Sequence, residues 1–318
     1  MVVKYFQKDN PELAKDLSKV KRQMKKAVVL KNETVKKAIF DIFDAGGKML
    51  RPAYLLLFSD FTDLKAEQRI ALAAAVEMLH TATLIHDDIV DQADIRRDVE
   101  TISHKYGADV AVYAGDYLFV SVFKILGQQS LELSNLTEQT SSIERLLGGE
   151  LGQMSKRFDL TQTIEDYIEN ISGKTAELFA LSCSIPAMIV GDKKLAKPAF
   201  EIGKNIGIAF QIMDDYLDYT SGSSEFGKPV LEDIKQGVYS APVLYVLESD
   251  RAYVSKILEA KNFEAFNKFL AQSDALEKTK KLAESYTDKA LDLMKKLPKT
   301  ETTEKIIQIT KKLLERKI

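Results

Sequence analysis

Apolar side chains recur every three or four positions along most of this chain, which is the period of an α-helix. The segment 66–91 (AEQRIALAAAVEMLHTATLIHDDIVD) is apolar on almost every face, which predicts a long buried helix. At about 1.5 Å per residue, that helix would be roughly 40 Å long. A second such helix is predicted over 194–219. Two further core helices are expected over 109–127 and 161–190, the latter broken near Pro186.

Turn-forming residues separate these helical segments. Loops are predicted at Gly46-Gly47, over 98–107, and over 220–237 with its Ser, Gly and Pro residues. We find no convincing run of strand alternation and no Pro/Gly/Ser linker. The sequence therefore predicts one all-α domain that spans residues 1–318.

The last part of the chain, residues 276–318, is rich in Lys and Glu, with apolar residues such as Ile306, Ile309 and Leu313 at helical spacing. This pattern predicts a helix that packs on the outside of the domain with one solvated face. We favour that interpretation over a helix that lies on a membrane surface, although the pattern leaves such a peripheral contact open.

Composition restricts the class of protein. The 318 residues include only 15 Gly and 7 Pro, and the net charge of −2 gives no general attraction to nucleic acid. The single cysteine, Cys183, fits a reducing compartment. The first residues lack the layout of a signal peptide, and no uninterrupted apolar run reaches the roughly 18 residues of a transmembrane segment. We expect a cytoplasmic protein.

Two near-copies of one acidic motif, DDIVD and DDYLD, stand at the ends of the two long apolar segments. Residues four apart share one face of a helix, so Asp87 lies beside Asp91, and Asp214 lies beside Asp218. Like charges at this spacing repel, which suggests that a cation is held there. A site of carboxylate oxygens with little histidine nearby suits a hard ion such as Mg²⁺. In proteins Mg²⁺ is usually bound by one or two carboxylates together with the phosphates of a substrate.

Cations accompany the first acidic motif. Arg96 and Arg97 follow it by one to two turns, and His80 precedes Asp87 by two turns on the same face. Further positive charge comes from the Gly46-Gly47 loop and from later in the chain: Lys48, Arg51, Lys174 and Lys228. Metals held by carboxylates would bind one polyanion and guanidinium groups another. Two diphosphates fit that description.

The motifs resemble those of the trans-polyprenyl diphosphate synthases over roughly residues 46–247. GGKMLRP, LIHDDIVDQADIRR, KTAELF, FQIMDDYLD and FGKPVLEDIKQG occur in the order expected for that family. The resemblance implies a single-domain helical bundle around a deep central cavity, of the isoprenoid synthase type. It also implies a head-to-tail prenyl transfer between isopentenyl diphosphate and an allylic prenyl diphosphate, in an enzyme that commonly forms dimers.

The resemblance also implies roles for individual residues. Mg²⁺ ions on the allylic diphosphate would be held by three aspartates, with two more as helpers: Asp87, Asp91 and Asp214, and then Asp88 and Asp218. Isopentenyl diphosphate would contact Lys48, Arg51, His80 and Arg97. The allylic diphosphate would contact Arg96, Lys174 and Lys228. Thr175 and Gln211 would face the developing allylic cation, and Lys174 and Gln211 count with the aspartates as catalytic.

Small residues before the first acidic motif carry a prediction about product length. In the family, a bulky residue five positions before the first aspartate limits chain growth, and here that residue is Ala82, followed by Thr83. Ala74 and Ala75 lie about two turns deeper. We therefore expect a product of six or more isoprene units, with Phe119 or Phe123 as the floor of the tunnel.

Three other functions fit the sequence less well. A di-iron carboxylate bundle needs two Glu-x-x-His pairs, and the chain has only Glu77 with His80. A terpene cyclase would not need the cations that suit a second diphosphate. A catalytically silent regulatory subunit would be expected to lose aspartates, and both motifs are intact. The sequence leaves open whether the chain pairs with itself or is the catalytic half of a heterodimer.

Overall fold

The computed structural model describes residues 6–97, 99–129, 133–220 and 233–314. By its internal contacts the chain divides into two compact units: residues 1–140 with 181–199, and residues 141–180 with 200–318. Both units are built almost entirely of α-helices, so the predicted all-α class is confirmed. The expectation of a single domain over residues 1–318 stays a prediction.

The elements of the first unit are helices and one short hairpin: α2 (Pro11–Ala27), α3 (Glu33–Ala45), α4 (Leu50–Ser59), α5 (Ala66–Val90), β1 (Ile95–Arg96), β2 (Val99–Glu100), α6 (Ile102–Tyr106) and α7 (Ala108–Gln129). Three long helices contribute residues to both units: α8 (Leu133–Ser155), α10 (Glu177–Ile189) and α11 (Lys193–Thr220). The remaining elements belong to the second unit: α9 (Ile164–Ile171), a π-helical turn η1 (Ser172–Ala176), α13 (Ala241–Ser249), α14 (Arg251–Glu259), α15 (Phe263–Gln272), α16 (Ala275–Met294) and α17 (Glu301–Leu314).

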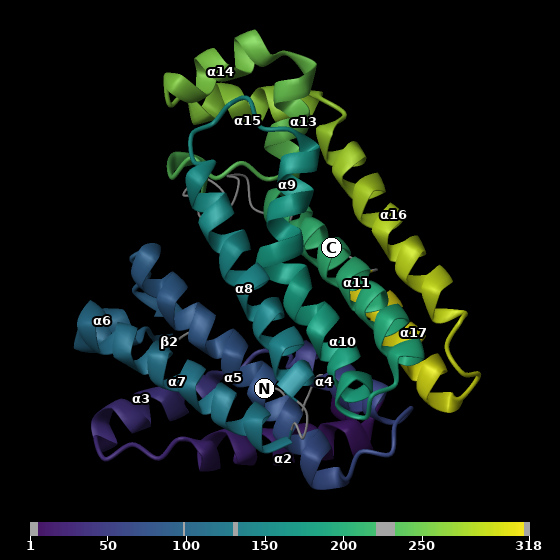
Figure 1. The fold of residues 1–318 in the computed structure, drawn as a ribbon. Helices are drawn as coiled ribbons and strands as arrows, with labels where there is room; N and C mark the ends of the chain where they lie inside the picture. Colours follow the sequence, from purple (N-terminus) through teal and green to yellow (C-terminus); the bar gives the residue numbers. More distant parts are fainter. Residues whose placement is uncertain (1–5, 98, 130–132, 221–232, 315–318) are drawn as a thin grey trace. The chain divides into compact units, whose positions relative to one another are not determined.

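Helix α5 is the central element of the first unit. It packs against α2, α4 and α7 (Figure 1), and its apolar side chains, such as Leu72 and Leu79, are fully buried. Helix α7 comes close to α5 at Gly115, where a Cβ would lie 2.4 Å from Nε2 of His86. A larger residue would require the His86 ring to move, so glycine lets α7 lie close to the end of α5 that carries the first acidic motif.

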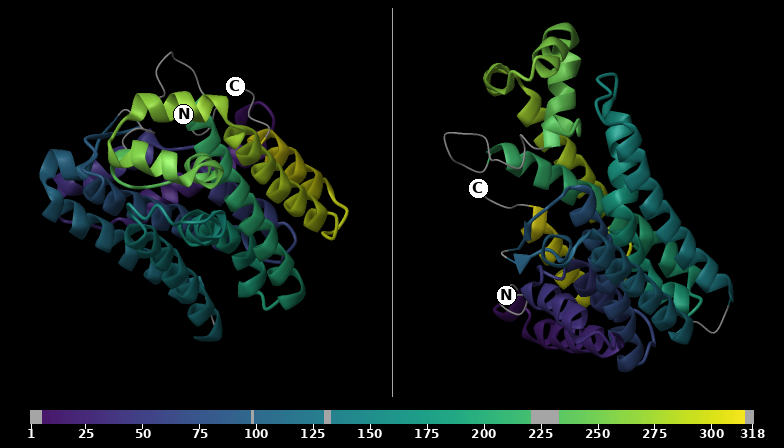
Figure 2. Two further views of the ribbon diagram at one scale, coloured as in Figure 1. Left: turned by 90° about the horizontal axis from the view of Figure 1, so that it is seen from above. Right: turned by 90° about the vertical axis from the view of Figure 1, so that its left-hand side faces the viewer.

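The core of the second unit is formed by α11, α13 and the helices that follow them. Leu247 on α13, Phe266 on α15 and Ala283 on α16 are fully buried in one hydrophobic cluster. The helices α16 and α17 pack against each other as a hairpin, drawn in yellow in Figure 2. Ile306, Ile309 and Leu313 are the buried face of α17, as the helical spacing predicted.

Several predicted boundaries agree with the structure. The helix predicted over 66–91 is α5, which ends at Val90 with Asp91 as its C-cap. The helix predicted over 194–219 is α11, and the helix over 109–127 is α7, each with ends that differ by one or two residues. Long apolar segments with clear periodicity are therefore well predicted.

Three other predictions were wrong in detail. Helix α10 continues through Pro186, and the irregular turn of this region is instead η1. The predicted loop over 98–107 contains β2 and α6. The C-terminal helix is two helices, interrupted near Pro298. The predicted loop over 220–237 lies mostly outside the described residues.

Among the described helices, α7 alone is long and apolar enough to cross a membrane, with a mean hydropathy of 1.5 over its most apolar window. A little under half of that window, 44%, is buried inside the protein. Core helices of soluble proteins have the same length and composition, so this is weak support for a membrane span.

Candidate active site

The first acidic motif lies at the C-terminal end of α5. The backbone N–H of Asp91 donates to the carbonyl of Asp87 at 2.8 Å, so the two side chains lie one turn apart on one face. The carbonyl end of a helix disfavours negative charge, and neighbouring carboxylates repel. Both effects would be relieved by a cation at this position.

Asp88 points away from that face. Its buried carboxylate forms an ion pair with Nε of Arg96 at 2.5 Å. Burial raises the pKa of Asp88, and the Arg96 guanidinium opposes that rise. Asp88 and Arg96 therefore hold the end of α5 and the β1–β2 hairpin together.

The glycine loop before α4 lies against Arg97. A Cβ on Gly47 would be 2.9 to 3.1 Å from the guanidinium nitrogens of Arg97, so a larger residue would require the Arg97 side chain to shift. Gly46 and Met49 have positive φ angles of 43° and 49°, which shape the loop on either side. Lys48 is exposed on the same loop.

A buried glutamate accompanies the basic side chains of the first unit. Glu77 on α5 is only 6% exposed, and burial raises its pKa while the charges of Arg51 and Arg97 lower it. One turn later, burial holds the pKa of His80 well below its ordinary value, and the charges of Arg51, Arg97 and Arg96 act in the same direction. Within this unit, the structure thus brings together three of the four residues predicted to bind isopentenyl diphosphate.

The second acidic motif lies near the C-terminal end of α11. Burial raises the pKa of Asp218 to about 6, with further contributions from the negative charges of Asp214 and Asp233. Burial also raises the pKa of Asp215 to about 7, although hydrogen bonds from Tyr167 and Gln211 favour its ionised form. Burial and the mutual repulsion of neighbouring carboxylates therefore both disfavour the ionised forms of Asp215 and Asp218.

Gln211 and Thr175 meet within the second unit, as the predicted common role requires. The Thr175 hydroxyl donates to Oε1 of Gln211 at 2.7 Å. Their contact depends on a close approach one turn away, where a Cβ on Gly207 would lie 2.5 Å from the Cα of Ala176. Thr175 and Ala176 both belong to the π-helical turn η1, and such turns are frequent at functional sites.

Lys174 precedes Thr175 in the same turn. Its ammonium group forms an ion pair with Glu150 at 2.9 Å and donates to Oε1 of Gln153 at 3.0 Å. The backbones of α8 and η1 touch at glycines, since a Cβ on Gly149 would lie 2.4 Å from the backbone nitrogen of Lys174. Helix α8 thus fixes the position of this cation.

The small residues predicted to control chain length lie in the buried part of α5. Ala74 and Ala82 have no accessible surface, and Thr83 donates its hydroxyl to the carbonyl of His80 at 2.8 Å. The aromatic ring of Phe119 stacks on His86 with the ring centres 5.7 Å apart, whereas Phe123 is exposed. Of the two residues predicted to form the floor of the tunnel, only Phe119 packs against α5 in this way.

Sequence reasoning did not identify two of the buried groups in these clusters. Glu77 was considered only as a di-iron ligand, and Tyr167, which donates its hydroxyl to Asp215, was not considered. A lone glutamate in an apolar helix is a usable signal of a buried counter-charge, but nothing local marks Tyr167. The predicted residue Lys228 lies outside the described residues.

No group of three or more His, Cys, Asp or Glu side chains in the described parts of the chain is gathered tightly enough to hold a metal ion by itself. Each acidic motif instead offers a pair of carboxylates one helical turn apart: Asp87 with Asp91, and Asp214 with Asp218. Hard oxygen donors in pairs, with mutual repulsion, fit an ion such as Mg²⁺ that completes its coordination with substrate phosphates.

A family model described as "Polyprenyl synthetase" matches residues 32–274. Heptaprenyl diphosphate synthase component 2 from Geobacillus stearothermophilus is 33% identical over 298 residues, which cover 91% of this chain and 92% of that protein. Among solved structures, the chain is similar to a geranylgeranyl pyrophosphate synthase from Lactobacillus brevis, with a TM-score of 0.94, 36% identity and coverage of 98% and 99%. It is also similar to a polyprenyl synthase from Caulobacter crescentus complexed with calcium and isoprenyl diphosphate, with a TM-score of 0.86, 27% identity and coverage of 96% and 95%.

Proposed function

Because this chain belongs to the polyprenyl synthetase family and is a prenyltransferase, we propose that it extends an allylic diphosphate with isopentenyl diphosphate to a long-chain polyprenyl diphosphate, with Mg²⁺ as cofactor. We propose a trans, head-to-tail connection because the sequence motifs resemble those of the trans-polyprenyl diphosphate synthases. The proposed location is the cytoplasm.

The observation that carries this proposal is that the chain has both pairs of carboxylates and a cluster of basic side chains. Each long helix ends in two carboxylates on one face, and the first unit also holds the cluster of Arg51, His80 and Arg97. The carboxylate pairs suit a metal-bound diphosphate, whereas the guanidinium groups suit a second diphosphate without metal. These two kinds of site match a reaction of two diphosphate substrates, in which only the allylic diphosphate departs as a leaving group.

The chain's residues would act on separate parts of the reaction. Asp87, Asp91, Asp214 and Asp218 would ligate the metal, which when bound stabilises the negative charge of the departing diphosphate. Lys48, Arg51, His80 and Arg97 would bind and orient isopentenyl diphosphate. Lys174, Arg96 and Lys228 would bind the allylic diphosphate. Thr175 and Gln211 would place oxygen dipoles toward the allylic cation, which buried apolar walls protect from water.

We propose a product of six or more isoprene units. The support is the small side chain of Ala82 at the position where a bulky residue would stop growth, with Ala74 and Ala75 two turns deeper. Similar proteins carry names of both kinds, heptaprenyl and geranylgeranyl, so the product length needs its own measurement.

We also propose that the chain works as a homodimer. Helix α7 exposes Tyr113, Val120 and Phe123 on one face, and α8 exposes an apolar stripe with Leu147 and Leu151 one turn apart. Contiguous apolar stripes on a protein surface are typical of interfaces. A heterodimer is the alternative, because one similar protein is named as a component. Sedimentation of the chain alone distinguishes the two.

Product analysis tests the function. The purified chain is incubated with Mg²⁺, labelled isopentenyl diphosphate and a farnesyl or geranylgeranyl primer, and the products are sized. We expect long products from the chain alone. Asp87→Ala and Asp214→Ala should each remove nearly all turnover and leave the helical circular dichroism unchanged. If the chain turns over no primer, it is the partner-dependent half of a heterodimer or a silent subunit.

A further inference from the structure

Tyr167 is a buried residue of α9 that has no part in the reaction described above. Its hydroxyl donates to Oδ2 of Asp215 at 2.6 Å, while Nε2 of Gln211 donates to the other carboxylate oxygen at 2.8 Å. Oε1 of Gln211 in turn accepts from the Thr175 hydroxyl at 2.7 Å. Three hydrogen bonds therefore connect Tyr167 to the two residues that would face the allylic cation.

This chain of hydrogen bonds decides which way the Gln211 amide points. A carboxylate only accepts hydrogen bonds, so Asp215 selects the NH₂ end of the amide. The carbonyl end is left toward Thr175, and a carbonyl oxygen has two lone pairs, of which Thr175 occupies one. The second lone pair carries the partial negative charge that stabilises a positive centre. A flipped amide would present N–H groups instead, which would oppose the cation.

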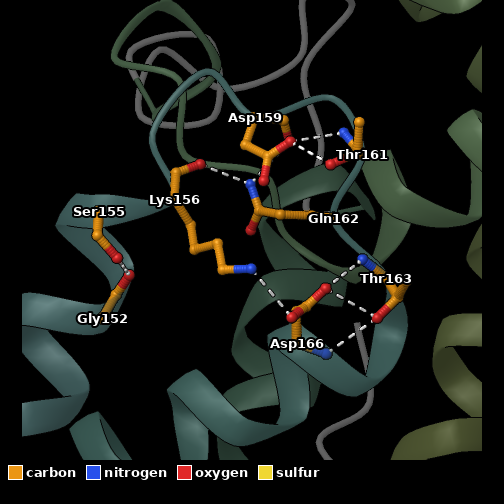
Figure 3. Close-up of polar contacts among 8 residues, drawn as sticks. All are labelled: Gly152, Ser155, Lys156, Asp159, Thr161, Gln162, Thr163 and Asp166. Carbon is orange, nitrogen blue, oxygen red and sulfur yellow. Dashed lines mark hydrogen bonds and ion pairs between the residues drawn. The ribbon is translucent and has the colours of Figure 1, made fainter.

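The first turn of α9, which carries Tyr167, begins at a loop after α8 whose polar contacts are drawn in Figure 3. Thr163 and Asp166 form a reciprocal capping box at the start of α9, with hydrogen bonds of 2.9 to 3.1 Å. Lys156 forms an ion pair with Asp166 at 3.1 Å, and the Gln162 side chain donates to the carbonyl of Lys156 at 2.7 Å. Asp166 is the residue before Tyr167, so this loop fixes the turn that carries the tyrosine.

We propose that Tyr167 is a positioning residue: through Asp215 it holds the Gln211 carbonyl toward the developing allylic cation. This inference rests on the proposed function, since it assumes that Gln211 and Thr175 face that cation. It also separates the aspartates of the second motif. Asp214 and Asp218 would ligate the metal, whereas Asp215, whose two carboxylate oxygens accept from Tyr167 and Gln211, would orient Gln211.

The test is Tyr167→Phe, which removes one hydroxyl and keeps the ring. We expect kcat to fall by about 10- to 100-fold, which is less than the loss on removing a catalytic dipole outright, because the Gln211 amide is displaced and not deleted. The KM for isopentenyl diphosphate should change by less than about threefold, because the residues proposed to bind it are untouched. The matched control is Tyr245→Phe, a partly buried tyrosine packed against the same hydrophobic cluster, which should keep its kcat.

A double-mutant cycle with Gln211→Ala separates positioning from general support of the fold. If Tyr167 acts through Gln211, adding Tyr167→Phe to Gln211→Ala should change kcat by less than about threefold. Full additivity, or an unchanged kcat in Tyr167→Phe alone, would overturn the inference. Should Tyr167→Phe lose its helical circular dichroism, the same cycle is run with Asp215→Ala, which removes the acceptor of the Gln211 amide, and the same two outcomes decide. A wild-type chain without turnover would overturn the proposed function and the inference together, whereas an active Tyr167→Phe beside an inactive Gln211→Ala overturns the inference alone.

Discussion

Asp215→Asn should stabilise the protein at alkaline pH. Burial raises the pKa of Asp215 from 3.8 to about 7, which means that the folded protein binds this proton more tightly than the unfolded chain. Its contribution to stability is therefore fully present below about pH 4 and is lost as the pH rises through about 7. Asparagine has no charge to bury, so the variant does not lose this contribution. Its amide still accepts from Gln211 and can donate to the Tyr167 oxygen.

The size of the effect follows from the shift. A shift of three pKa units corresponds to about 4 kcal/mol of unfolding free energy. About two of these units lie between pH 5 and the folded-state pKa of about 7, so about 3 kcal/mol is lost between pH 5 and pH 8. We would measure urea unfolding by circular dichroism, in chelator, for wild type and Asp215→Asn at several pH values across this range. The difference in unfolding free energy should rise by about 3 kcal/mol in favour of the variant. Asp63→Asn, at an exposed site, is the control. A difference that stays constant with pH would refute the assigned cause.

Three further substitutions test other parts of the site. Gly47→Ala places a Cβ 2.9 Å from the Arg97 guanidinium and should raise the KM for isopentenyl diphosphate about 10-fold in steady-state assays, whereas Gly127→Ala, with nothing within 4 Å, should not. Glu77→Gln should lower the thermal midpoint by a few degrees, because the guanidinium groups of Arg51 and Arg97 lose a buried counter-charge. Added inorganic pyrophosphate should raise the thermal midpoint of this variant more than that of wild type. An equal rise would contradict the pairing of Glu77 with the two arginines. Ala82→Phe should shorten the product to four units or fewer on product sizing; an unchanged length would show that this position does not limit growth.

The main helices were predictable because their signal is local and strong. The apolar run that ends in the first acidic motif predicted α5 to within a residue of its C-terminal end. Pro186 misled the prediction because proline normally interrupts a helix at a cost of about 3 kcal/mol. In α10 the neighbouring residues, such as Ile185 and Ala187, are fully buried. Tertiary packing of this kind outweighs the lost backbone hydrogen bond.

The site was predictable only in part. Helical spacing alone indicated that Asp87 and Asp91 share a face, but it did not indicate what Asp215 does on α11. What Asp215 does there depends on Tyr167, which is 48 positions away in the chain. A contact between residues that far apart leaves no periodic trace in one sequence. The close approach of Gly47 to Arg97 was not predicted either, because the two residues are far apart in the sequence.

The central claim is that both acidic motifs bind ions that share one allylic diphosphate. A crystal structure with Mn²⁺ and a non-cleavable allylic thiodiphosphate tests it most directly, because Mn²⁺ takes oxygen ligands like those of Mg²⁺ and is located by its anomalous signal. We predict ions ligated by Asp87 and Asp91 and by Asp214, all in contact with the same diphosphate. A metal-bound diphosphate that touches one motif only, with the other facing solvent, would contradict the claim.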